Sequence, residues 1–194
     1  MSELRIVLAD SDPVQRKNIR SMLVKLGYWV VGEAEDGLSA LKLVRSRQPD
    51  LLIIDAAVPG MDGLEVARLL YEDKLAPVIV LVSTVNSSLL DKAKGARVSA
   101  LLTRPVDETS LLPAIELAMA NYQEVVKLEK QVQELKEALE TRKLVERAKG
   151  ILMETLGLTE AEAYRRMQKQ SMDKRISMRQ VAEAIILAHS IKKG

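Results

Sequence analysis

The chain has 194 residues, which is enough for one ordinary domain and a smaller second one, and it contains no cysteine. The lack of cysteine excludes disulfides and thiolate metal sites and fits a reducing compartment. The net charge of +2 hides an asymmetry, because residues 141–194 contain 12 Lys and Arg against six Asp and Glu. An anionic partner is therefore expected at the C-terminal quarter of the chain.

The first residues do not resemble a secretion signal. They lack the basic flank and the long apolar run of a signal peptide. Elsewhere, no apolar run approaches the ~20 residues that a helix needs to span a bilayer. We therefore expect a soluble, cytoplasmic protein with no membrane partner.

Residues 1–120 alternate between short apolar runs and segments of helical periodicity. The runs are rich in Val, Ile and Leu without strict alternation, which is typical of strands covered on both faces of a parallel sheet. We expect strands at Leu4–Ala9, Tyr28–Val31, Leu51–Ile54, Val78–Val82 and Ala100–Leu102. Helical patterns follow them at Pro13–Leu26, Leu38–Arg47, Leu64–Tyr71, Ser88–Lys94 and Asp107–Tyr122. Five such pairs predict an α/β domain with a five-stranded, doubly wound parallel sheet of the flavodoxin-like kind.

Polar side chains follow four of these strands. They are Asp10, Ser11 and Asp12 after the first strand, Asp55 after the third, Ser83 and Thr84 after the fourth, and Arg104 after the fifth. Because the carboxyl ends of parallel strands meet at one edge of the sheet, these side chains should form one site. Carboxylates beside hydroxyls and a cation suit Mg²⁺ and a phosphate group, and an aspartate there can attack a phosphoryl group.

This arrangement resembles the receiver domain of two-component response regulators. The resemblance rests on Leu51–Gly63 and covers roughly the first 120 residues. It implies that Asp55 is the phosphoacceptor and that a sensor histidine kinase is a partner. It also implies a Mg²⁺ ion held by Asp10, Asp55 and the carbonyl of Ala57, with Asp12 as a further candidate ligand. Ser83, Thr84 and Arg104 would contact the phosphoryl group, and the Arg104–Pro105 peptide would be cis.

Several positions depart from the family pattern. Ser11 stands where the family usually has its metal-binding acid, and Leu101 stands where an aromatic residue is common. Arg104 replaces the usual lysine with a planar fork. Counting back from Arg104 places the switch hydroxyl on Val82, although Ser83 could serve after a slip of one residue. Two alternatives stay open: regulated phosphorylation at Asp55, or a pseudo-receiver that keeps the fold without the chemistry.

The segment 121–140 is expected to be a coiled-coil helix that continues the last helix of the first domain. No Gly or Pro interrupts the run between Ala114 and Lys149. Apolar residues recur at alternating spacings of three and four, which predicts the seam of a parallel dimer. The seam residues are Val125, Leu128, Val132, Leu135 and Leu139. The alternative is a solvated linker helix that docks on its own domain.

Residues 141–194 predict a small bundle of three helices. Gly157 is a plausible helix stop, and Thr159 and Ser177 each begin a capping pattern. In the third helix we expect an inner face of Val181, Ala184, Ile185 and Ala188. The bundle contains ten candidate nucleic-acid contacts. They are Arg142, Lys143, Arg147, Lys149, Arg165, Arg166, Lys169, Lys174, Arg175 and Arg179.

Three blocks of this region resemble the ANTAR domain of transcription antitermination regulators. They are Thr141–Met153, Leu158–Met167 and Ser177–Ile185. The resemblance implies binding of paired RNA stem-loops in a leader transcript, by a homodimer that supplies one basic bundle to each hairpin. A receiver, a coiled coil and an ANTAR domain in this order are typical of that family.

Two other functions are considered from the residues. A DNA-binding response regulator would need a recognition helix with polar base-reading residues, whereas the last helix is mostly apolar or small. A phosphatase using Asp10 and Asp12 would also need a lysine, a later acidic pair and a cap region, none of which is apparent. We therefore expect a protein that is not an enzyme.

Overall fold

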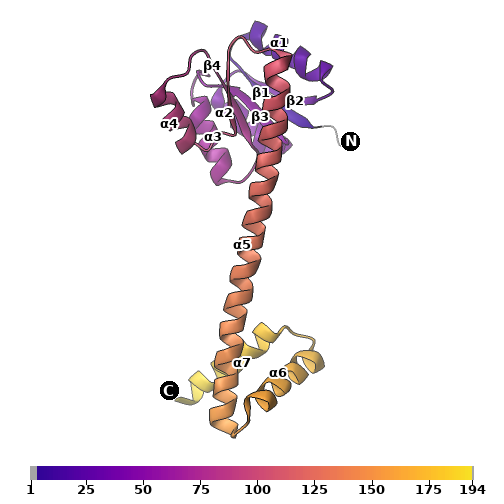
Figure 1. The fold of residues 1–194 in the computed structure, drawn as a ribbon, viewed down its shortest axis with the longest axis vertical. Helices are drawn as coiled ribbons and strands as arrows, with labels where there is room; N and C mark the ends of the chain where they lie inside the picture. Colours follow the sequence, from indigo (N-terminus) through magenta and orange to yellow (C-terminus); the bar gives the residue numbers. More distant parts are fainter. Residues whose placement is uncertain (1–3, 194) are drawn as a thin grey trace. The chain divides into compact units, whose positions relative to one another are not determined.

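The computed structural model describes residues 4–193, which divide into two compact units between Val126 and Lys127. The first unit contains a five-stranded parallel sheet with the strand order β2-β1-β3-β4-β5 (Figure 1). Its strands are β1 (Arg5–Ala9), β2 (Trp29–Ala34), β3 (Leu51–Asp55), β4 (Val78–Val82) and β5 (Ala100–Thr103). The predicted α/β fold is therefore confirmed, although β2 extends three residues beyond its expected end.

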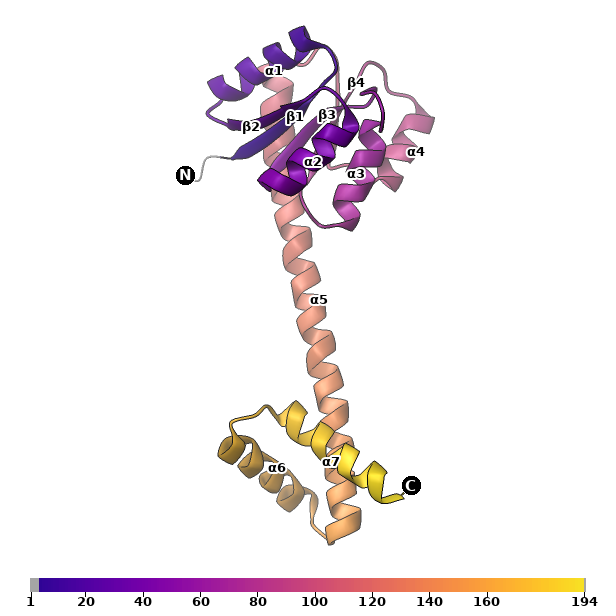
Figure 2. The same cartoon turned by 180° about the vertical axis from the view of Figure 1, so that it is seen from behind.

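Helices cover both faces of this sheet. The helices of the first unit are α1 (Pro13–Lys25), α2 (Gly37–Arg47), α3 (Gly63–Glu72), α4 (Ser87–Gly95) and the beginning of α5 (Glu108–Leu156). The N-terminal part of α5 lies in front of the sheet in Figure 1, and α2 and α3 lie in front in Figure 2. Because both faces are covered, every residue of β4 is buried, which explains its unbroken apolar sequence.

The two faces form separate aliphatic cores. One core packs α2 and α3 against the sheet, with Val44 and Leu70 fully buried. The other packs α1 and α5 against the opposite face, with Leu23 and Ile115 fully buried. The sheet is thus held on both sides by packing of aliphatic side chains, which fits a chain without phenylalanine.

Capping side chains decide where several helices begin. Asp36 accepts a hydrogen bond from the backbone N–H of Ser39, so α2 begins at Gly37 rather than at the expected Leu38. Asp62 does the same for Glu65, so α3 begins one residue earlier than expected. Each carboxylate satisfies a backbone donor that the helix itself leaves without a partner.

The second unit is a bundle formed by the C-terminal part of α5, α6 (Glu160–Lys174) and α7 (Met178–Lys193). Helix α5 is continuous over 49 residues, so the predicted coiled-coil segment and the first bundle helix are parts of one helix. The bundle core consists of Val145, Ala148, Leu152, Ala163, Met167, Val181 and Ala182. The expected inner face of α7 was partly wrong, because Ala184 and Ala188 are exposed and Ala182 is buried next to Val181.

None of the helices within residues 4–193 is both long enough and apolar enough to cross a membrane. Even the long helix α5 carries many charged side chains along its length.

Gly37 provides a test of the contact between α2 and the loop that follows β3. A Cβ atom at Gly37 would lie 1.9 Å from the carbonyl oxygen of Met61, which is backbone and cannot rotate away. Gly37→Ala should therefore destabilise the protein by about 1–3 kcal/mol. Thermal or urea unfolding measures this change.

Gly95→Ala is the matched control, because no atom lies within 4 Å of a Cβ at that position in α4. We expect it to leave stability unchanged or to raise it by up to ~1 kcal/mol, since alanine is the better helix former. Equal stabilities of the two variants would contradict the close approach of Gly37 and Met61.

Candidate functional site: an acidic strand-end site and a basic helical bundle

The order of the strands brings the predicted receiver residues together. Asp10 directly follows β1 and Asp55 ends β3, and these two strands are neighbours in the sheet. Arg104 follows β5, two strands away from β3, and its backbone N–H donates to the carbonyl of Val82 at the end of β4. Its side chain therefore starts close to the carboxyl ends of β1 and β3 and reaches both aspartates.

Arg104 joins the two aspartates through its guanidinium group. Its Nη2 atom lies 2.5 Å from Oδ2 of Asp10 and 2.6 Å from Oδ2 of Asp55. Its Nε atom donates to the same oxygen of Asp55 at 3.0 Å, and Nη1 donates to Oε1 of Gln15 at 3.2 Å. All three guanidinium nitrogens are thus engaged, and the Asp10 and Arg104 side chains are only 3% and 17% exposed.

The remaining carboxylate oxygens are also engaged. Oδ1 of Asp10 accepts from the backbone N–H of Asp12 at 2.9 Å, and Oδ1 of Asp55 accepts from that of Ala57 at 2.7 Å. Burial by itself lowers the pKa of Arg104, but its hydrogen bonds to Asp10 and Asp55 outweigh this effect and raise that pKa above its ordinary value. Arg104 is therefore a permanent cation at this site.

The other predicted site residues follow the ends of the same strands as Asp10, Asp55 and Arg104 or of the neighbouring strand β4. Asp12 is the N-cap of α1, and its Oδ1 accepts from the N–H groups of Val14 and Gln15 at 2.8 and 3.3 Å. Ser83 and Thr84 follow β4, are exposed, and make no hydrogen bond within the described part of the chain. The Arg104–Pro105 peptide is cis, as the family resemblance implied.

The predicted Mg²⁺ ligands do not fit a bound ion in this arrangement. Mg²⁺ requires oxygen ligands in near-octahedral geometry. Asp10 and Asp55 come together, but all four of their oxygens accept hydrogen bonds, and Asp12 caps a helix. Within residues 4–193 no group of three or more His, Cys, Asp and Glu is arranged to hold a metal. Binding an ion would require Arg104 to leave the two carboxylates.

Sequence reasoning missed two residues of this site. Gln15 accepts a hydrogen bond from Nη1 of Arg104 through its Oε1 atom. Arg16 donates from its own Nη1 to the backbone carbonyl of Asp10 at 2.6 Å. Arg16 is itself paired with Glu33 and Glu35 around the end of β2. The sequence places Gln15 and Arg16 only a few residues after Asp10 and Asp12, at the start of α1. This closeness in sequence was the available signal, but it does not show where the two side chains point.

The ten predicted RNA contacts fall into three groups in the structure. Seven are exposed and make no ion pair to a carboxylate within the part of the chain that the structure describes. They are Arg142, Arg147, Arg165, Arg166, Lys169, Lys174 and Arg175. Lys143 and Arg179 are exposed but paired, with Glu140 at 2.8 Å and Glu183 at 2.9 Å.

Lys149 differs from the other nine because its side chain is only 9% exposed. Its Nζ atom lies 2.8 Å from Oε1 of both Glu146 and Glu160, so it connects α5 to α6. Hydrogen bonds to Glu146 and Glu160 raise the pKa of Lys149. The hydrogen bond from Lys149 lowers the pKa of Glu160. Contact of Lys149 with RNA stays a prediction, but its position indicates a structural role in the bundle.

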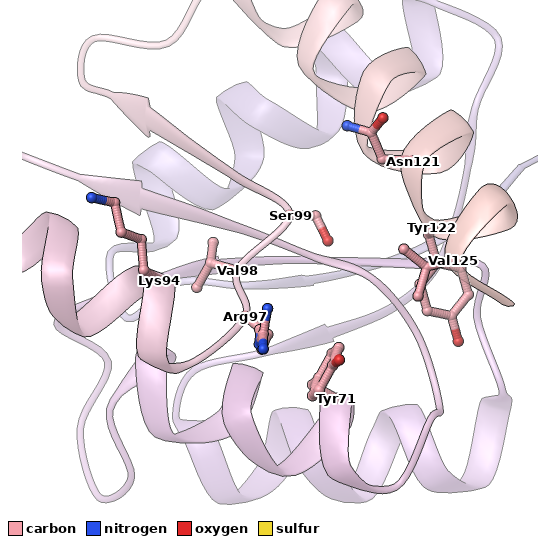
Figure 3. Close-up of a pocket in the computed structure, with 8 residues that line it drawn as sticks. All are labelled: Tyr71, Lys94, Arg97, Val98, Ser99, Asn121, Tyr122 and Val125. Carbon is pink, nitrogen blue, oxygen red and sulfur yellow. The ribbon is translucent and has the colours of Figure 1, made fainter. Parts of the chain in front are cut away.

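A separate hollow of about 390 Å³ lies near the amino ends of the strands, away from the acidic site (Figure 3). Its wall includes Tyr71 at the end of α3, Ser99 before β5, and Tyr122 on α5. The guanidinium carbon of Arg97 lies 5.7 Å from the centre of the Tyr71 ring, which is a cation–π distance. No motif in the sequence pointed to this hollow.

Comparison with known proteins accounts for both parts of the chain. The model of the response regulator receiver domain matches residues 6–116, and the model of the ANTAR domain matches residues 133–186. The transcriptional regulatory protein PdtaR of Mycobacterium tuberculosis is 40% identical over 182 residues, which are 94% of this chain and 89% of PdtaR. The chain belongs to the ANTAR response regulators. This family membership makes it an RNA-binding response regulator of the antitermination type.

Solved structures resemble the receiver part of this ANTAR response regulator. The signal receiver domain of NarL from Mycobacterium tuberculosis has 27% identity and a TM-score of 0.57, and the match covers 61% of this chain and 98% of that one. A LuxR-family two-component response regulator from Aurantimonas has 33% identity and a TM-score of 0.58, with 62% and 87% covered. Receiver domains generally bind Mg²⁺, which makes the position of Arg104 between Asp10 and Asp55 notable in this chain.

Lys149→Met tests the structural role of the buried lysine. The variant leaves Glu146 and Glu160 without their shared partner, so we expect the bundle to unfold at a lower temperature than in the wild type. Lys169→Met removes the same charge from an exposed site on α6 and should leave the melting temperature nearly unchanged. Circular dichroism of the full chain measures both, and equal melting temperatures would contradict the assignment.

Proposed function

We propose that two copies of this ANTAR response regulator pair along α5 and present two basic bundles to paired stem-loops in a leader transcript. Binding of the stem-loops would disfavour a terminator and let transcription continue. The observation that carries the proposal is the group of seven exposed cations without a carboxylate partner on the bundle. Cations of this kind can neutralise RNA phosphates without first breaking an internal ion pair.

Pairing along α5 is supported by an exposed apolar seam. All five predicted seam residues lie on α5, and their exposed fractions are at least 42% in the single chain. They are Val125, Leu128, Val132, Leu135 and Leu139. Apolar side chains at heptad spacing are ordinarily covered by a partner helix. A homodimer would cover these residues and would bring two bundles to one RNA, which adds avidity without new contacts.

The receiver domain supplies the input to this dimer. We propose Asp55 as the phosphoacceptor for a sensor histidine kinase or a small phosphodonor. An Asp55 oxygen would form the new bond to phosphorus while the donor's bond breaks, which is a phosphorus–nitrogen bond in a kinase phosphohistidine, leaving the imidazole, and a phosphorus–oxygen bond in acetyl phosphate, leaving acetate. Both Asp55 oxygens accept hydrogen bonds, so Arg104 would have to release Oδ2 for this reaction. The alternative is a pseudo-receiver that responds to a protein partner instead.

The other functions have less support. A DNA-reading role for α7 is disfavoured because exposed positions of this helix include Leu187 and Ile191, which cannot form hydrogen bonds with base edges. A phosphatase that uses Asp12 is disfavoured because the Asp12 carboxylate caps α1. We therefore propose that the chain acts by binding and not by catalysis.

Arg166→Glu and Arg147→Glu test the basic face. We expect each change to weaken binding of a two-hairpin leader RNA and to reduce the slope of log affinity against log salt by about 1 or more. Filter binding or fluorescence anisotropy over a salt series measures both quantities. Lys17→Glu on α1 is the control with the same charge change on the receiver, and it should have little effect. Unchanged affinity in both bundle variants would remove this face from the function.

Leu135→Lys tests the seam, because it places a charge on the exposed apolar stripe. We expect a monomer by sedimentation, and avidity for a two-hairpin RNA reduced by on the order of 100-fold. Affinity for a single hairpin should not change. Gln133→Lys adds the same charge to α5 outside the seam and should stay dimeric. A wild-type monomer that keeps the two-hairpin preference would contradict pairing along α5.

Phosphorylation at Asp55 is tested by mass spectrometry after incubation with acetyl phosphate and Mg²⁺. We expect the wild type to gain the mass of one phosphoryl group and Asp55→Asn to gain none, because the amide is not a nucleophile. If the two proteins stay equal in mass at millimolar reagent, the pseudo-receiver alternative is the correct one.

A further inference from the structure

The acidic site of the receiver already contains a cation, and that cation belongs to the chain. Asp10 and Asp55 lie at the ends of neighbouring strands, and their side chains are 3% and 14% exposed. Two carboxylates this close and this buried repel each other unless a positive charge lies between them. The Nη2 atom of Arg104 lies within 2.6 Å of both.

The guanidinium group is well suited to this position. It is planar and offers several N–H donors in a fixed fork, so one side chain can serve two carboxylates at once. Here Nη2 donates to both aspartates, and Nε donates a second hydrogen bond to Asp55. The remaining nitrogen, Nη1, donates to Gln15. A lysine ammonium is a single point charge and could not make this set of contacts.

The Nη2 atom of Arg104 lies between the two carboxylates, where a divalent ion would have to bind. The four oxygens of Asp10 and Asp55 each accept a hydrogen bond from Arg104 or from the backbone. The third nearby acid, Asp12, is used as the cap of α1, and Ser11 offers no carboxylate. A divalent ion would therefore have to displace a part-buried ion pair, which solvent and salt screen weakly.

We propose that Arg104 is the resident cation of this receiver, holding Asp10 and Asp55 in the place of a divalent metal and competing with Mg²⁺ for both. The site then stays closed around Arg104 in the presence of Mg²⁺, and opening it requires an event that moves the guanidinium group. The inference does not depend on RNA binding or on phosphorylation of Asp55, and its test uses neither.

The first test compares melting temperatures of the full chain in EDTA and in millimolar Mg²⁺. The wild type should melt at the same temperature in both. Arg104→Met should melt lower in EDTA, because Asp10 and Asp55 lose their counter-charge, and Mg²⁺ should restore part of the loss. Arg68→Met removes an exposed arginine of the same domain and should respond to neither change.

The second test uses Arg104→Lys, which keeps the charge and so remains available if the methionine variant does not fold. Calorimetric titration with Mg²⁺ should give an affinity for Arg104→Lys at least about tenfold tighter than for the wild type, since one ammonium nitrogen cannot reproduce the fork by which Nε and Nη2 together hold Asp55. Adding Asp55→Asn to the lysine variant should abolish the gain. Equal Mg²⁺ affinity in wild type and Arg104→Lys would overturn the proposal, as would an Arg104→Met protein that is as stable as the wild type in EDTA.

Discussion

The ion pair of Arg104 with Asp10 and Asp55 is the interaction on which the receiver site depends. The parallel sheet places β1 next to β3, so the acids at their carboxyl ends come close together whatever the rest of the chain does. Such a pair is unfavourable without a counter-charge, because two carboxylates at one poorly solvated site repel each other. Arg104 enters from β5 and supplies that charge, so the chain itself makes the site electrostatically acceptable.

The two units of the chain treat charge in opposite ways. In the receiver, the functional acids are neutralised internally, and each of their oxygens has a donor. On the bundle, most of the cations remain exposed and lack acidic partners within the described residues. Internal neutralisation keeps a site closed until something displaces the partner, whereas uncompensated surface cations are ready to bind an anion. A closed acidic site and an open basic face fit the roles proposed for the two units.

Much of this architecture could be predicted from the sequence, because apolar runs of β-branched and aliphatic residues identify buried parallel strands with little ambiguity. Val78–Val82 was expected as a strand and is one, with identical bounds. The expectation that Asp10, Asp55 and Arg104 lie close together followed from the same parallel arrangement, and the structure brings these three side chains together. What could not be predicted is how far a side chain reaches: the sequence places Arg104 after the last strand, but only the structure shows it spanning the end of β4 to join two other strands.

Lys149 illustrates the same limit in the bundle. By charge alone, Lys149 looks like the exposed Arg147. However, Lys149 follows Val145 by four residues and precedes Leu152 by three, which places it beside the apolar stripe of α5. The positional signal was present, yet its partner Glu160 lies on another helix and no local spacing reveals it. The heptad seam is a different case, because its pattern is clear in the sequence whereas its partner is a second molecule.

The burial of Lys149 has a consequence for how the bundle responds to its ionic surroundings. Mobile counter-ions reach exposed guanidinium and ammonium groups readily, and the Debye length falls as electrolyte is added. They reach the Lys149 side chain less readily, because it is only 9% exposed, although its partners Glu146 and Glu160 are 56% and 70% exposed. Electrolyte should therefore weaken the hold on a polyanion well before it loosens the junction of α5 and α6. The bundle can release a transcript and remain folded.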